Sequence, residues 1–307
     1  MSSDEDFSAG FTAVQPEVIT PSSRAGSTDA AGCLFSCLIV NYNAGNFLSR
    51  CLISLFAHLG QNNFEVIVVD NFSSDDSIAR AKRLNLEVRW FELEHNAGFA
   101  RANNLATSAA RGEFLVLLNP DTEITRDCIT PLVQYLMGHA EVGLVGGHHQ
   151  DGNGCWQRSF DLTPTIRREF DYALLPRRYW NALPTESPTK PVEVGWLYGS
   201  FLVIRRALTD EIGLFDEIFF LNDEDMDLAR RVWKHNLKVV YHPVCGLIHY
   251  GGVSKRASST AMWEYVRSRR RYYSKYYGRI AEALYCLAAL LRKLRDALAS
   301  FLNSSHG

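Results

Sequence analysis

The sequence predicts an α/β fold with a doubly wound mixed sheet, followed by a basic helical tail. Short apolar runs that end in polar residues alternate with stretches of helical spacing through the first 140 residues, as in βαβ units. The chain has 307 residues and is 47% hydrophobic, which is enough for one large core or two small ones. From Lys255 onward, eleven Lys and Arg residues stand against three Asp and Glu residues, a net charge of +8.

Three segments differ in composition. Residues 1–32 contain five acidic residues and one basic residue and have no apolar stretch typical of a signal peptide, so we expect a disordered leader. Residues 33–255 form the expected α/β domain, and residues 256–307 form the basic amphipathic tail. The seven cysteines form no CxxC pair and no Cys/His ligand spacing, so neither a zinc site nor a disulfide framework is predicted and a reducing cytosol fits best.

The elements of the α/β domain follow one another closely. The apolar run at 33–43 ends in polar residues, as a buried parallel strand does at the carboxyl edge of a sheet. Residues 46–59 have helical spacing, and residues 64–71 form a second buried strand that ends in Asp70 and Asn71. The remaining predicted elements are a helix after the cap SSDDS, a strand at 86–93, a helix at 98–110, a strand at 112–124, an irregular stretch at 151–194 and a strand leading into a helix at 195–208.

The polar strand ends predict a ligand site at the carboxyl edge of the sheet. No GxGxxG motif follows the first strand and no GxxxxGK[ST] motif occurs, so neither a dinucleotide fingerprint nor a P-loop is present. Asp70 could accept a hydrogen bond from the imide N–H of uracil or thymine, or it could be a turn or capping residue. Asp121, in Asn119-Pro-Asp121, could bind Mg²⁺ or Mn²⁺ that bridges a diphosphate, or the tripeptide could be an ordinary turn.

Seven motifs, in this order, resemble family 2 glycosyltransferases of the GT-A fold, and especially bacterial rhamnosyltransferase-like members. They are IVNYN, VIVVDN, NAGFARANN, LLNPDT, GWLYGSFLVIRR, GLFDEIFFLNDEDMDLARRV and IHYGGVS, and they span roughly residues 34–255. The resemblance implies a nucleotide-diphosphate sugar donor and a divalent cation, Mg²⁺ or Mn²⁺. The family's metal motif is often Asp-x-Asp, and here Asn119 replaces the first acid, which leaves Asp121 as the expected ligand. His249 is implied as the second metal ligand, although a lone histidine is by itself more often structural.

The segment 219–231 gathers four carboxylates. Inverting sugar transfer needs a base that deprotonates the acceptor hydroxyl, and the resemblance assigns this role to Asp225, with Glu224 positioning the acceptor. We expect the crowding of carboxylates to raise the pKa of at least one of them. Asp227 is expected to cap the following helix, and Asp223 to be a solvated acid near the helix N-terminus. The alternative is that all four acids form a solvated helix N-terminus.

Other motif positions are expected to contact the substrates. Trp196 and Tyr198 either form an apolar platform for a sugar or its leaving phosphate, or are core aromatics. Gly251, Gly252 and Ser254 are expected to form a closing loop near the diphosphate. The arginines of 156–180 would suit an anionic acceptor such as a lipid diphosphate, or belong to a surface loop. The residues expected to bind substrate are Val40, Tyr42, Asp70, Asn96, Gly98, Asn104, Asn119, Trp196, Gly199 and Arg231.

The basic tail is expected to contact a partner. Its longest apolar run, residues 283–291, is far shorter than the ~20 residues needed to span a bilayer, and basic residues follow it at once. We therefore expect the tail to lie on an anionic membrane surface. A homodimer contact is the second interpretation, and nucleic acid is not expected as a partner.

Together these features are interpreted as an inverting glycosyltransferase in the cytoplasm, peripheral on the inner face of the plasma membrane. The expected donor is a nucleotide sugar, with dTDP-rhamnose preferred to a UDP-sugar. The expected acceptor is a polyprenyl-diphosphate-linked saccharide of cell-wall, capsule or O-antigen synthesis. A nucleotidyltransferase is one alternative, and it would need a basic glycine-rich loop where the chain has NYNAGNF. A sugar-binding scaffold without turnover is the other, and the presence together of Asp121, Asp225 and His249 argues against it.

Overall fold

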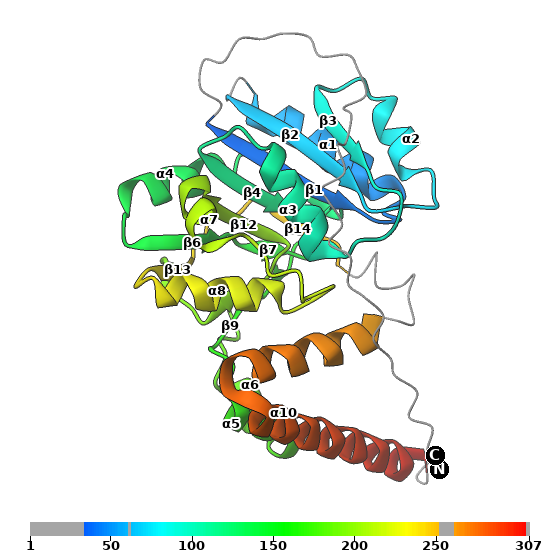
Figure 1. The fold of residues 1–307 in the computed structure, drawn as a ribbon, viewed down its shortest axis with the longest axis vertical. Coiled ribbons are helices and arrows are strands. Elements are labelled where there is room, and N and C mark those ends of the chain that lie inside the picture. The colour runs from blue at the N-terminus through cyan, green and yellow to red at the C-terminus, as the bar shows by residue number, and fades with distance from the viewer. Residues whose placement is uncertain (1–33, 61–62, 252–260, 305–307) are drawn as a thin grey trace, which may run out of the picture.

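The structure is a computed structural model, and it describes residues 34–60, 63–251 and 261–304. The predicted leader, together with Gly252 and Ser254 of the predicted closing loop, lies outside the described residues. An α/β unit occupies the upper part of the view in Figure 1, and three helical elements, α5, α6 and α10, lie below it.

A mixed eight-stranded sheet forms the centre of the α/β unit, in the order β10-β13-β6-β12-β4-β1-β2-β3 (Figure 1). Strands β4, β1, β2 and β3 run parallel to one another, whereas β12 runs antiparallel to both β4 and β6. This confirms the predicted mixed α/β sheet. The strands are β1 (Phe35–Asn41), β2 (Phe64–Asp70), β3 (Val88–Glu92), β4 (Phe114–Leu118), β6 (Val142–Gly146), β10 (Val192–Glu193), β12 (Phe201–Arg205) and β13 (Lys238–Tyr241).

The sequence pattern explains why this sheet is covered on both faces. Successive residues of β1 point to opposite sides, so that Ile39 packs in one core and Val40 in the other. One face is covered by α1 through Leu52, and the opposite face by α3 through Ala102. The helices of the α/β unit are α1 (Asn46–Leu59), α2 (Ser77–Lys82), α3 (Phe99–Ala109), α4 (Thr130–Gly138), α7 (Arg206–Ile212) and α8 (Glu224–Lys234).

Two small sheets bring distant segments to the carboxyl edge of the large sheet. One has the order β5-β14-β7-β8 and the other pairs β11 with β9. In the first, His249 is the register partner of Thr122, so the residue after Asp121 lies beside the predicted second metal ligand. The strands are β5 (Thr122–Ile124), β7 (His149–Gln150), β8 (Trp156–Gln157), β9 (Phe160–Asp161), β11 (Trp196–Leu197) and β14 (Leu247–His249).

The remaining helices are α5 (Ile166–Leu174), α6 (Pro176–Asn181) and α10 (Ala261–Ser304). α10 bends at Gly278, whose φ of 79° and ψ of 179° interrupt the helix and suit only glycine. Figure 1 shows the two arms that result. The arms bury Tyr272, Tyr273 and Tyr285 in a third cluster with Phe219, so the tail is part of the folded core. No helix among the described residues has the length and apolar character required to cross a bilayer.

The sequence suggested that the basic residues of the tail would meet lipid head groups. In the structure, several of them form ion pairs with acidic residues of the same chain. Arg269 binds Asp223 and Glu169, Arg270 binds Glu282, and Lys275 binds Asp216 and Asp227. The net charge of the tail therefore overstates the charge that it presents to a partner.

Candidate active site

A cavity of about 560 Å³ opens at the carboxyl edge of the sheet. One half is lined by residues that follow the parallel strands and by the small sheet that carries His249. The other half is lined by the segment 158–180 and by the first arm of α10. Such a crevice, outside the carboxyl ends of strands, is the usual ligand site of open α/β sheets.

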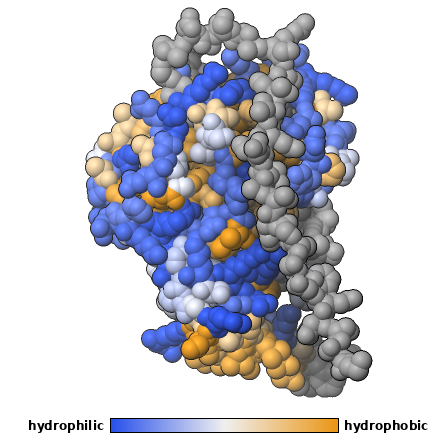
Figure 2. All heavy atoms as spheres, viewed as in Figure 1, coloured by the Kyte–Doolittle hydropathy of each residue, from blue (hydrophilic) through white to orange (hydrophobic). Residues whose placement is uncertain are grey.

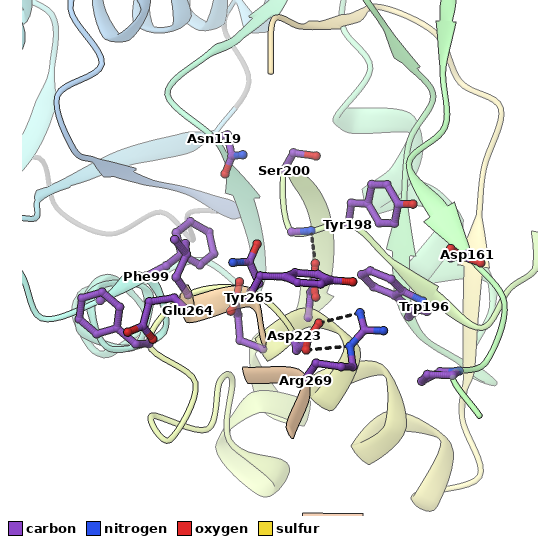
Figure 3. Close-up of a pocket in the computed structure, with 18 of the residues that line it drawn as sticks. Phe99, Asn119, Asp161, Trp196, Tyr198, Ser200, Asp223, Glu264, Tyr265 and Arg269 are labelled. Atoms are coloured by element: carbon purple, nitrogen blue, oxygen red, sulfur yellow. Dashed lines mark hydrogen bonds and ion pairs between the residues drawn. The ribbon is translucent and has the colours of Figure 1, made fainter. Parts of the chain in front are cut away.

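Most of the residues expected in the site line this cavity. They are Val40, Tyr42, Asn96, Gly98, Asn119, Asp121, Trp196, Gly199, Glu224, Asp225 and His249. Trp196 and Tyr198 both face it, with ring centroids 4.9 Å apart (Figure 3). These residues come from different kinds of segment, since Asn119 follows β4, Gly199 precedes the antiparallel β12 and Asp225 lies in α8.

Three of the expected substrate-binding residues do not line the cavity. The Asp70 carboxylate accepts hydrogen bonds from Asn41 Nδ2 at 2.8 Å and Ser73 Oγ at 2.6 Å, and so joins the loops after β1 and β2. Asn104 exchanges two hydrogen bonds with the main chain of Phe215, which fastens α3 to the segment before α8.

Arg231 is the third, and its partners are structural. Its Nε lies 2.8 Å from the Asp227 carboxylate, and its remaining nitrogens donate to the carbonyls of residues 212–214. It thus balances the charge of Asp227 and does so away from the cavity, so the structure gives no support to its expected role in substrate binding.

Asp225 lies in the second residue of α8, between the two halves of the cavity. Its Oδ2 accepts a hydrogen bond from the Gly199 N–H at 2.7 Å, and its Oδ1 accepts one from its neighbour Met226 N–H at 2.7 Å. Burial raises the pKa of Asp225 to about 7, the Gly199 N–H lowers it, and the charge of Asp223 raises it further. The sequence attributed the shift to crowded carboxylates, whereas burial is the larger cause. A carboxylate with a pKa near 7 is suited to accept a proton at neutral pH.

The neighbouring acids are buried and not solvated. Asp223, only 3% exposed, holds the N-cap position of α8 with a φ of 66° and forms two contacts with Arg269, at 2.9 and 3.0 Å (Figure 3). Asp227 lies inside α8 and not at its cap, is fully buried, and binds Arg231, Lys275 and Tyr276. The expectations of a solvated Asp223 and a capping Asp227 were therefore wrong. The cations that stabilise both acids come mainly from α10, some 45 residues away in the sequence.

Asp121 and His249 face each other at the other end of the cavity. The Asp121 Oδ1 lies 3.5 Å from His249 Nε2, and His249 Nδ1 is 2.9 Å from the amide oxygen of Gln157. In the tautomer in which His249 Nδ1 donates to this amide oxygen, the Nε2 lone pair is directed toward Asp121. A carboxylate oxygen and an imidazole nitrogen that converge in this way suit Mg²⁺ or Mn²⁺, provided that diphosphate oxygens complete the coordination. Among the described residues, no group of three or more His, Cys, Asp or Glu side chains forms a complete metal site.

The residues of α10 are the main part of the cavity that sequence reasoning missed. Glu264, Tyr265 and Arg269 line it, and Figure 3 shows Tyr265 and Arg269 in the same space as Trp196 and Asp223. The sequence did hold one signal for this contact. Four crowded carboxylates need cations, and the densest source of cations in the chain is the run of arginines at 267–271.

Comparison with known proteins finds glycosyltransferases. The family model described as Glycosyl transferase family 2 matches residues 36–213. An N-acetylglucosaminyl-diphospho-decaprenol L-rhamnosyltransferase of Mycobacterium tuberculosis is 29% identical over 229 residues, which cover 69% of this chain and 74% of that protein.

Two solved glycosyltransferase structures show a similar fold. GalNAc-T7 with UDP, GalNAc and Mn²⁺ aligns with a TM-score of 0.57 and 20% identity, over 88% of this chain and 55% of that one. Staphylococcus aureus TarS 1–349 in complex with UDP-GlcNAc aligns with a TM-score of 0.53 and 20% identity, over 78% of this chain and 65% of that one. This chain thus spans between about half and two thirds of these solved chains. Because the family model matches more than half of its length, the chain belongs to glycosyl transferase family 2, and its α/β unit has the GT-A fold.

Proposed function

We propose that this glycosyltransferase inverts the anomeric centre of a nucleotide-diphosphate sugar, with Asp225 as the general base. The observation that carries the proposal is the position of Asp225, a carboxylate with a pKa near 7 between the two halves of one cavity. A donor bound on the strand-end half and an acceptor bound on the other half would meet at this residue. Glu224, adjacent to it and also lining the cavity, positions the acceptor.

The proposed reaction transfers one proton and one glycosyl group. Asp225 takes the proton of an acceptor hydroxyl as the hydroxyl oxygen bonds to the anomeric carbon. The bond from the anomeric carbon to the diphosphate breaks on the opposite face, and the nucleoside diphosphate leaves with the bonding electrons. The hydrogen bond from the Gly199 N–H holds the Asp225 carboxylate in a fixed orientation for this transfer.

We infer that Asp121 and His249 would hold a divalent cation, Mg²⁺ or Mn²⁺, on the donor side. When bound, the cation would neutralise the leaving diphosphate. The geometry of the two side chains supports the inference, and so does the Mn²⁺ that accompanies UDP in the solved GalNAc-T7 structure.

The proposed donor is dTDP-rhamnose or a related nucleotide sugar, and the proposed acceptor is a saccharide linked to a polyprenyl diphosphate in cell-wall or polysaccharide synthesis. The name of the mycobacterial relative, which specifies L-rhamnose and a decaprenol-linked N-acetylglucosamine, supports both assignments. The solved structures of GalNAc-T7 and TarS contain uracil nucleotides, which makes UDP-sugars the first donors to compare with dTDP-rhamnose.

A nucleotide-sugar panel tests the proposal. Thermal shift with and without Mn²⁺ identifies the donor, and transfer is then measured for the wild type, Asp225→Asn and the control Asp210→Asn, an exposed acid of α7. We expect Asp225→Asn to bind the donor normally and to lower kcat by at least ~100-fold, while the control keeps wild-type turnover. Near-normal turnover of Asp225→Asn would refute the assignment of the base. Donor binding without transfer by the wild type would identify a scaffold.

We further propose that the protein acts at the cytoplasmic face of the plasma membrane through the second arm of α10. Figure 2 shows a hydrophobic surface at the lower end of the molecule, where this arm lies in Figure 1. It carries a row of leucines that are between 38% and 63% exposed, at positions 284, 287, 290, 294 and 298. Since several basic residues of the tail are paired internally, apolar contacts provide more of the attraction than the net charge indicates.

Co-sedimentation with phosphatidylglycerol-containing vesicles tests this location. We expect Leu290→Glu/Leu294→Glu to lose vesicle binding and Ile53→Glu, a similarly exposed site on α1, to keep it. High salt should weaken wild-type binding only in part, because salt screens charges but not apolar contacts. If the wild type stays in the supernatant and the double variant converts a dimer into a monomer, the leucine row is a homodimer contact.

A further inference from the structure

The arginines of the segment 156–180 differ in their surroundings. Arg167 and Arg178 extend away from the cavity and are more than half exposed. Arg168 lines the cavity, but its Nη2 lies 3.3 Å from the Asp161 carboxylate, and its guanidinium lies over Tyr179 at 4.8 Å. Arg158 also lines the cavity, and no carboxylate among the described residues lies within 4.0 Å of it. It is thus a cavity cation without an anionic partner from the described part of the chain.

Two aromatic residues determine where the Arg158 guanidinium lies. It is 5.2 Å from the ring centroid of Trp180, a side chain that is 46% exposed, and it interacts with the hydroxyl of Tyr198. Its Nε is buried and has no hydrogen-bond partner in the structure. A buried, unused guanidinium donor costs free energy unless a ligand accepts from it.

The position of Arg158 assigns it to the acceptor half of the cavity. The preceding residue, Gln157, binds His249 on the metal side. Tyr198, whose hydroxyl the guanidinium meets, immediately precedes Gly199, whose N–H binds Asp225. Arg158 belongs to the segment 158–180 that lines the second half of the cavity, and its guanidinium lies next to the exposed Trp180 of the same segment.

We propose that Arg158 binds a phosphate group of the acceptor, held between Trp180 and Tyr198. A guanidinium presents parallel N–H donors that match two phosphate oxygens, and stacking on an aromatic ring keeps its plane fixed. The other two arginines that line the cavity, Arg168 and Arg269, are paired with carboxylates, which leaves Arg158 as the lining arginine available to an anion among the described residues. The identification of this ligand as the acceptor rests on the proposed function, whereas the anion site itself does not depend on turnover.

Geranyl diphosphate is a suitable probe, because it carries a diphosphate and a short isoprenoid chain but no sugar. Its binding is measured by calorimetry with the full chain and saturating nucleoside diphosphate, which fills the donor half. The variants are Arg158→Gln, Arg158→Lys and the control Arg167→Gln, whose side chain is 74% exposed outside the cavity. We expect Arg158→Gln to bind about 10- to 100-fold more weakly, the range for losing hydrogen bonds to a charged group, and Arg158→Lys to be intermediate.

The result separates this inference from the proposed function. Wild-type affinity of Arg158→Gln, or no binding by the wild type, overturns the phosphate site. Loss of binding by Arg158→Gln, with unchanged nucleotide affinity and melting temperature, supports it even if no nucleotide sugar is turned over. With an active donor, the KM for N-acetylglucosaminyl diphosphofarnesol should rise by the same factor in Arg158→Gln. The KM for octyl N-acetylglucosaminide, which has no phosphate, should not change.

Discussion

Replacement of Arg269 by methionine should show how strongly the C-terminal helix supports the proposed base. Arg269 forms two contacts with Asp223 at 2.9 and 3.0 Å and one with Glu169 at 2.8 Å. The three side chains are at most 10% exposed, so the ion cluster is shielded from water. Burial by itself would lower the pKa of Arg269, but Asp223 and Glu169 outweigh this effect and raise it.

The magnitude follows from what Arg269→Met leaves behind. Asp223 and Glu169 would remain as buried carboxylates without a cation, and breaking such a pair costs about 3–5 kcal/mol. At roughly 2–4 °C per kcal/mol for a domain of similar size, the melting temperature should fall on the order of 10 °C. The second change Asp223→Asn, made in the Arg269→Met background, removes one stranded charge and should restore part of the loss.

Differential scanning fluorimetry and the pH dependence of transfer together measure this effect. Since the charge of Arg269 lowers the pKa of Asp225, its removal should move the acid limb of the kcat profile to higher pH. The control is Arg267→Met, two residues away with a side chain 58% exposed, which should change stability by less than about 0.5 kcal/mol. If Arg269→Met melts within about 1 °C of the wild type and keeps its pH profile, the cluster does not support α8 and the reasoning fails.

Three further predictions concern the cavity. Because the pKa of Asp225 in the folded protein is raised to about 7, its contribution to stability is fully present below pH ~4 and is lost as the pH rises through 7. Asp225→Asn cannot ionise, so between pH ~4 and a pH above 7 its free energy of unfolding should gain a few kcal/mol relative to the wild type, as measured by chemical denaturation at the two pH values. EDTA should abolish transfer, and Asp121→Ala should weaken the binding of a nucleoside diphosphate far more than the binding of the nucleoside. Transfer by protein that is confirmed to be free of metal would contradict this prediction. Gln157→Leu should lower Mn²⁺ affinity by about 10- to 100-fold in calorimetry, because His249 loses the partner that fixes its tautomer; unchanged affinity would exclude this role.

The sheet and the meeting of polar strand ends at one of its edges were predictable because local pattern determines them. Buried strands read as apolar runs, and their polar ends must meet at one edge once the strands are parallel, as Asn41 and Asp70 do in the register of β1 and β2. The same rule could not tell which polar residue faces a ligand. Asp70 and Asn71 are adjacent at the end of β2, yet only Asn71 lines the cavity, because Asn41 and Ser73 engage the Asp70 carboxylate.

The environment of the acidic segment was not predictable, because it depends on contacts far along the chain. In the sequence, Asp223 was expected to be a solvated acid near the helix start and Asp227 a helix cap. Their burial depends on Arg269 and Lys275, which reach them only because α10 folds back against α8. Periodicity detects a helix but not the surface on which it packs. The entire amphipathic tail was therefore assigned to a membrane surface.

The family match and the motifs cover different parts of the cavity. The matched region, residues 36–213, contains the strand ends, Asp121 and the segment 158–180, whereas Asp225, His249 and the whole of α10 lie outside it. The wall formed by 158–180 and α10 contains Arg158, Trp180 and Tyr265, and none of these belongs to the seven motifs. If the strand-end half binds the donor and the second wall binds the acceptor, as proposed, substitutions at Arg158 or Tyr265 should change acceptor preference without changing the nucleotide. The seven motifs do not include the residues of the second wall, so acceptor identity must be decided by experiments on that wall.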